Sequence, residues 1–136
     1  MFNGIIKYTG KIYKISKKKN NCSLEILSGL KFSKKEIGSS ISCSGACLTL
    51  EKYKKNLCTF YISKETLNKT NFKFAKKDDV INIEKSIHYG SRISGHFVQG
   101  HIDTTSEIKQ IRFVGKSWFM TFKLPKKGKK NIVEKG

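Results

Sequence analysis

Proline and arginine are nearly absent from this chain of 136 residues. Pro125 is the one proline, and all 28 basic residues are lysines except Arg92 and Arg112. Without proline-rich or other low-complexity stretches, the sequence predicts no long flexible linker. The shortage of arginine disfavours a protein that reads bases or clamps phosphates, because the planar guanidinium suits both tasks better than an ammonium group.

Acidic residues are also few, ten against 28 basic ones, and the formal net charge is +18. Such a charge occurs in nucleic-acid-binding proteins. Here the lysines fall in short runs along the whole chain, mostly where turns are expected, which is typical of a solvated surface. We therefore expect no nucleic-acid partner, with a basic nucleic-acid-binding barrel as a disfavoured alternative.

Long apolar runs are missing too. No run of 18 apolar residues occurs, and the apolar stretch after Met1 is far too short for the core of a signal peptide. The sequence thus predicts a cytoplasmic protein with no membrane partner. Its cysteines should be reduced there, and because no Cys-x-x-Cys pair occurs, they predict no metal site. The four are Cys22, Cys43, Cys47 and Cys58.

Short strands dominate the pattern that remains. Stretches rich in β-branched, aromatic or alternating residues occur at 6–15, 23–27, 40–44, 47–51, 58–62 and 80–84. Regularly spaced short strands predict a small closed barrel or a sandwich, so the fold class is all-β. Two short helical pieces are predicted, one at 32–37 and one just after Ser63, which would serve as its N-cap.

The beginning of the chain is repeated 96 residues later. The pattern Gly4-x-Ile6-x-x-Thr9-Gly10-x-Ile12-x-x-Ile15 returns as Gly100-x-Ile102-x-x-Thr105-Ser106-x-Ile108-x-x-Ile111, and the Gly10/Ser106 pair is the one difference. A repeat of this length indicates two copies of one domain. We place the first copy at 1–94 and the start of an incomplete second copy at 95–136.

Two motifs carry candidate chemistry. Alternation from Ser44 to Leu50 puts Cys47 and Thr49 on one face and two leucines on the other, which suits a polar pocket, although a free cysteine is more often a buried hydrophobe. His96 and His101 are five residues apart, a spacing that does not favour a shared metal. Each is either a proton-transfer or ligand-contacting residue or a structural one, and His101 lies in the repeat of Ile5.

Five motifs in the same order resemble the riboflavin synthase family. They are Met-Phe-x-Gly-Ile-Ile from Met1, Ser-x-x-x-x-Gly-x-Cys-Leu-Thr from Ser40 to Thr49, Lys-Glu-Thr-Leu-x-x-Thr from Lys64 to Thr70, Val-Ile-Asn-Ile-Glu from Val80 to Glu84, and Gly-His-Phe-Val-Gln-Gly-His-Ile-Asp from Gly95 to Asp103. The resemblance covers the whole chain, and the last motif is the most specific.

The resemblance implies two six-stranded antiparallel Greek-key barrels with short helices in a homotrimer. It also implies the dismutation of two 6,7-dimethyl-8-ribityllumazine molecules to riboflavin and 5-amino-6-ribitylamino-uracil, with no cofactor. The enzyme would hold two rings in a reactive geometry and move protons. The chain ends at Lys135-Gly136, where the family continues, so we interpret it as truncated within the second barrel and inactive alone.

The resemblance also assigns site residues. Cys47 and His101 would be catalytic, and Phe2 would cover the site. Substrate would be bound, largely through the main chain, by Gly4, Ile5, Ile6, Ser40, Cys47, Leu48, Thr49, Tyr61, Ile62, Ser63, Lys64, Glu65, Thr66, Gly100, His101 and Ile102, with Lys135 reaching a neighbouring subunit's ligand. The alternative function is that of a lumazine- or flavin-binding protein of the same family without turnover.

Overall fold

The computed structural model describes residues 1–19, 21–126 and 128–134. These residues form two compact units, one from Met1 to Ile102 and one that begins at Asp103.

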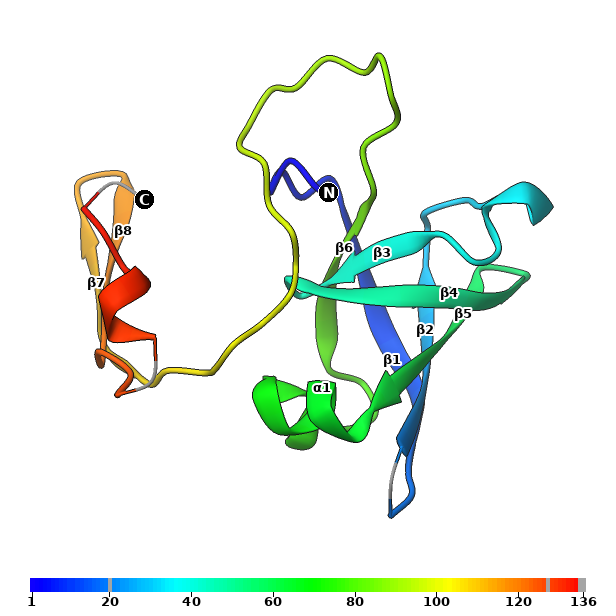
Figure 1. The fold of residues 1–136 in the computed structure, drawn as a ribbon, viewed down its shortest axis with the longest axis horizontal. Helices are drawn as coiled ribbons and strands as arrows, with labels where there is room; N and C mark the ends of the chain where they lie inside the picture. Colours follow the sequence, from blue (N-terminus) through cyan, green and yellow to red (C-terminus); the bar gives the residue numbers. More distant parts are fainter. Residues whose placement is uncertain (20, 127, 135–136) are drawn as a thin grey trace. The chain divides into compact units, whose positions relative to one another are not determined.

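The first unit is a closed barrel of six antiparallel strands. Around the barrel their order is β1, β2, β5, β4, β3, β6, so that neighbours along the sheet are not always neighbours in sequence (Figure 1). The strands are β1 (Tyr8–Lys17), β2 (Asn21–Ser28), β3 (Ser40–Cys43), β4 (Ala46–Lys54), β5 (Leu57–Ser63) and β6 (Val80–Lys85). The prediction of an all-β fold with a six-stranded antiparallel barrel is confirmed.

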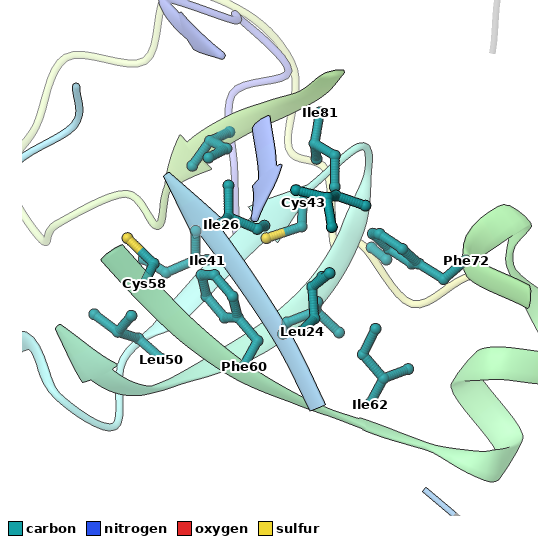
Figure 2. Packing of buried hydrophobic residues seen from close by; sticks show 14 of the residues in the cluster. Leu24, Ile26, Ile41, Cys43, Leu50, Cys58, Phe60, Ile62, Phe72 and Ile81 are labelled. Carbon is teal, nitrogen blue, oxygen red and sulfur yellow. The ribbon is translucent and has the colours of Figure 1, made fainter. Parts of the chain in front are cut away.

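The barrel closes because alternate residues along much of its strands are apolar and point inward. In β2 the side chains of Cys22, Leu24 and Ile26 are fully buried, and those between them are more exposed. Figure 2 shows that Leu24 and Ile26 meet residues from other strands in the interior, among them Phe60 and Ile41. Burying such side chains supplies most of the free energy that holds a small domain together.

Short helical pieces lie in two of the connections between strands. The helix α1 (Lys64–Lys69) starts at Ser63, whose hydroxyl accepts a hydrogen bond from Thr66 N–H, so the predicted N-cap is confirmed. The predicted piece at 32–37 is a single 3-10 turn, η1 (Lys34–Glu36). A second turn, η2 (Asn71–Lys73), was not predicted, and its Phe72 is buried in the core.

The first strand starts two residues later than the sequence predicts. Residues 2–6, here called the N-terminal strap, are irregular, because Gly4 adopts a left-handed conformation with φ of +74°. The N–H groups of Asn3 and Gly4 donate to the carboxylate of Glu84 instead of joining the ladder between β1 and β6.

The second unit contains a hairpin of β7 (Ile108–Val114) and β8 (Ser117–Phe122), followed by a 3-10 turn, η3 (Lys129–Asn131). Its register repeats that of β1 and β2 with a shift of 96 residues. Ile12 pairs with Ile26 in the first hairpin, and Ile108 pairs with Phe122 in the second. The register shifts directly after Ile12 in β1 and directly after Ile108 in β7. The hairpin therefore reproduces the first two strands of the barrel.

The apolar face of this hairpin is exposed within its unit. Ile12 and Ile26 are fully buried in the first barrel, whereas Ile108 and Phe122 are 53% and 54% exposed. The described part of the second unit has two strands where the first has six. This is the predicted incomplete second copy.

Candidate functional site

The outer face of β4 presents the two polar side chains that the sequence singled out. Cys47 is partly exposed and Thr49 is exposed, whereas Ala46, Leu48 and Leu50 are buried in the core. The predicted alternation is confirmed. On the neighbouring strand, Ser40 pairs with Thr49 across the β3–β4 ladder, so a second hydroxyl lies beside the first.

Strand β5 adds further polar side chains. Tyr61 is 46% exposed and Ser63 is partly exposed, while Ile62 between them is fully buried. Leu48 and Ile62 belong to the predicted site, but their side chains lie in the core, so each can contact a ligand only through its main chain. We call Ser40, Cys47, Thr49, Tyr61 and Ser63 the Cys47 face.

The ladder between β4 and β5 does not extend along the whole face. Among the described residues its register runs from Leu50 and Phe60 to Lys54 and Leu57. Cys47–Thr49 lie beyond that range, although β3 pairs with them on the other side. Where two strands part in this way, their main-chain N–H and C=O groups become available to another partner.

One such partner comes from the second repeat of the sequence. The N–H of Cys47 donates to the carbonyl oxygen of Gly100 at 2.8 Å. Gly100 has a φ of +78°, and Ile102 packs against the core. Residues 95–102, here called the docked segment, therefore belong to the first unit and lie on its barrel. Within this segment, the side chain of His101, which follows Gly100, is exposed.

Sequence reasoning missed this contact, since it placed Gly100, His101 and Ile102 in the incomplete second copy of the domain. A signal was present in the repeat itself. Gly4 and Gly100 occupy equivalent positions, and both adopt left-handed conformations that glycine tolerates best, with φ of +74° and +78°. In the structure Gly100 contacts Cys47, so the predicted site residues on β4 and those of the docked segment lie side by side.

The N-terminal strap lies against the docked segment rather than against Cys47. Phe2 and Val98, exactly 96 residues apart, form an antiparallel bridge with two hydrogen bonds of 2.8 and 3.0 Å. Phe2 is 1% exposed, whereas Ile5 and Ile6 are 39% and 40% exposed. Ile5 also lines a hollow of about 450 Å³ together with Tyr8, Glu84 and Arg92. The predicted covering role of Phe2 and the ligand contacts of this strap stay predictions.

The start of α1 places a hydroxyl pair at the end of β5. The oxygens of Ser63 and Thr66 lie 3.0 Å apart, and Ser63 also caps the helix. Glu65 forms an ion pair with Lys69 at 2.8 Å, and Lys64 is exposed. Thr66 thus adds a hydroxyl beside Ser63 of the Cys47 face. Lys135, the last predicted contact, lies outside the described residues.

Cys47 differs from the other three cysteines in its surroundings. All four are free thiols, but Cys22, Cys43 and Cys58 are buried. Burial disfavours the thiolate and raises the pKa of all three, that of Cys58 to about 11. Because the thiolate is the nucleophile, these three should be inert, and the accessible thiol is Cys47.

Neither a metal-ligand cluster nor a membrane-spanning helix occurs among the residues that the structure describes. No group of three or more His, Cys, Asp or Glu side chains there could hold a metal ion. Within the same residues, no helix combines the length and the apolarity that crossing a bilayer requires.

Comparison with known proteins agrees with the geometry. The model of the lumazine binding domain family matches residues 3–86. Riboflavin synthase of Bacillus amyloliquefaciens is 33% identical over the whole of this chain, which spans 63% of that protein. Riboflavin synthase of Escherichia coli is 35% identical over 117 residues, covering 82% of this chain and 53% of the relative.

Solved structures show the same fold. The crystal structure of LumP with riboflavin has a TM-score of 0.81 and 25% identity, covering 98% of this chain and 72% of that one. LumP with 6,7-dimethyl-8-(1'-D-ribityl) lumazine has a TM-score of 0.78 and 24% identity, covering 93% and 71%. The family match spans more than half of the sequence and all six strands of the barrel, and this chain belongs to the lumazine-binding domain family.

Proposed function

We propose that the first barrel binds 6,7-dimethyl-8-ribityllumazine on the Cys47 face. The observation that carries this proposal is the outward row of Ser40, Cys47, Thr49 and Ser63 beside parted strands. A pteridine ring needs main-chain partners for its polar edge, and a ribityl chain needs hydroxyls. The row offers both kinds of partner within one surface.

We further propose that this barrel serves the riboflavin synthase reaction. One lumazine gives a four-carbon unit to the other, and the two products together contain all atoms and electrons of the two substrates. No external oxidant or reductant is therefore required. The protein would mainly hold two rings at reacting distance, which alone can supply much of the acceleration.

Two side chains have proposed chemical roles. The Cys47 thiol is accessible and lies beside the docked segment, so it can add transiently to the ring or move a proton near it. The imidazole of His101 is exposed and follows Gly100 directly, and it can donate or accept a proton.

A second function is favoured by a specific observation. The described second unit has two strands, and the LumP structures hold a bound ligand on a similar fold. A lumazine- or flavin-binding protein without turnover needs only one complete barrel. We propose binding as the function of the first barrel by itself, and turnover as that of a chain with two complete pockets, in a cytoplasmic homotrimer.

The test is a fluorescence titration of this chain with 6,7-dimethyl-8-ribityllumazine. We expect saturable binding in the micromolar range, and Thr49→Val should weaken it about tenfold because a hydroxyl partner of the ligand is lost. Cys47→Ser should change binding by less than about threefold, since the shape is kept. Thr9→Val is the matched control, because Thr9 is also an exposed strand threonine.

Absence of saturable binding at high micromolar protein would contradict the proposal. Equal weakening by Thr9→Val and Thr49→Val would move the site away from the Cys47 face. Measured turnover by this chain would favour the synthase over the binding protein, whereas tight binding with no turnover would favour the reverse.

A further inference from the structure

The carboxylate of Glu84 holds the start of the chain in place. One oxygen accepts a hydrogen bond from Asn3 N–H at 2.7 Å, and the other accepts one from Gly4 N–H at 3.2 Å. Hydrogen bonds to an ionised carboxylate are stronger than those between neutral groups. Glu84 can act as a firm anchor, because β6 is paired with β1 on one side and with β3 on the other.

The anchored residues in turn hold the docked segment. Phe2 and Val98 exchange two main-chain hydrogen bonds, and Asn3 C=O accepts a third from His96 N–H at 3.2 Å. The nearest atom to a side chain added at Gly4 would be a methyl carbon of Val98, so the two segments are in close contact. The N-terminal strap therefore sets the position of Val98.

Two residues further on, the docked segment reaches Cys47. Gly100 C=O accepts the hydrogen bond from Cys47 N–H, and atoms of Cys47 and Gly45 leave little room for a side chain at Gly100. Hydrogen bonds joined by short stretches of main chain thus lead from the Glu84 carboxylate to the N-terminal strap, from the strap to His96 and Val98, and from Gly100 to the N–H of Cys47.

We propose that Glu84 is a positioning residue for the Cys47 face. It lies outside the row of residues that would touch the ligand, and it acts by fixing the N-terminal strap, which fixes the docked segment over Cys47. This inference rests on the proposed function for its effect on binding. The positional effect itself can be observed without any ligand.

The geometry requires a carboxylate with the length of glutamate. Two oxygens are used by two different N–H groups, and an amide has one acceptor oxygen. In Glu84→Gln the amide oxygen can keep the shorter hydrogen bond to Asn3 N–H. The amide NH₂ group would then face Gly4 N–H, and because both are donors, the second hydrogen bond is lost. Glu84→Ala removes both bonds. Glu84→Ala should therefore disturb the position of the N-terminal strap most, and Glu84→Gln should disturb it less.

The experiment is amide hydrogen exchange on the whole chain without ligand, followed at Cys47 N–H. We expect exchange at Cys47 to become at least about tenfold faster in Glu84→Ala and to change less in Glu84→Gln. Exchange at the core amides of Leu24 and Ile62 should stay within about twofold. Glu25→Gln is the control, because Glu25 is another partly buried strand carboxylate.

Unchanged exchange at Cys47 in Glu84→Ala would overturn the proposal. So would equal acceleration at Cys47, Leu24 and Ile62, because this would make Glu84 a general determinant of barrel stability. A Glu25→Gln effect as large as that of Glu84→Ala would overturn it as well.

A lumazine titration of the same variants separates this inference from the proposed function. If the unchanged protein binds, Glu84→Ala should weaken binding severalfold and Glu84→Gln should restore part of it. If the unchanged protein does not bind lumazine, the proposed function fails. The exchange result would still show whether Glu84 holds the docked segment at Cys47.

Discussion

Gly100→Ala should weaken lumazine binding about tenfold or more. An added β-carbon would lie 3.0 Å from the β-carbon and the nitrogen of Cys47 and from the oxygen of Gly45, and Gly100 also has a left-handed φ of +78°. The left-handed conformation costs alanine roughly 1–2 kcal/mol, and the overlap with main-chain atoms adds to it. The docked segment should leave Cys47 in response.

Gly90→Ala is the matched control for this change. Gly90 has a similar φ of +81°, but open space surrounds the position of its added carbon. It therefore carries the same conformational cost without the contact. The measurement is the dissociation constant by fluorescence titration, together with amide exchange at Cys47. Equal effects of the two substitutions would mean that the contact between Gly100 and Cys47 does not matter to the site.

Gly10→Ala should lower the free energy of unfolding of the first barrel by about 2–3 kcal/mol, through steric overlap alone. An added carbon would lie 2.5 Å from a methyl group of Ile26 and 2.6 Å from one of Ile83, both fully buried. Because the interior is closely packed, neither side chain can move without displacing others. The corresponding drop in melting temperature is on the order of 10 °C.

Gly29→Ala provides the comparison, because nothing lies within 4 Å of its added carbon. It should be neutral or slightly stabilising, since alanine restricts the unfolded chain. Thermal unfolding followed by circular dichroism measures both variants. A Gly10→Ala protein as stable as the Gly29→Ala protein would show that the packing around Ile26 and Ile83 is looser than described.

The strands and the repeat could be predicted from sequence because both depend on local pattern. Alternation in β2 and β4 reflects which side chains face the core, and the shift of 96 residues reappears in the registers of the two hairpins. Gly10 and Ser106, the one mismatch in the repeat, differ in surroundings. Gly10 is packed against Ile26 and Ile83, whereas the exposed Ser106 donates a hydrogen bond to the carbonyl of Lys123.

The arrangement around Cys47 could not be predicted in the same way. Contacts of the N-terminal strap and the docked segment join residues some 50 to 100 positions apart through main-chain groups, which leave no trace in residue type beyond the two glycines. The role of Glu84 was hidden for a similar reason. Its partners are the N–H groups of Asn3 and Gly4, and any residue except proline supplies an N–H.

The central claim is that lumazine occupies the Cys47 face, and alkylation of the chain by iodoacetamide tests it most directly. Without ligand, Cys47 should react first, because Cys22, Cys43 and Cys58 are buried and their thiol pKa values are raised. Saturating 6,7-dimethyl-8-ribityllumazine should slow the modification of Cys47 at least about tenfold, as measured by peptide mass spectrometry. An unchanged rate at Cys47, with ligand binding verified in the same sample, would contradict the account.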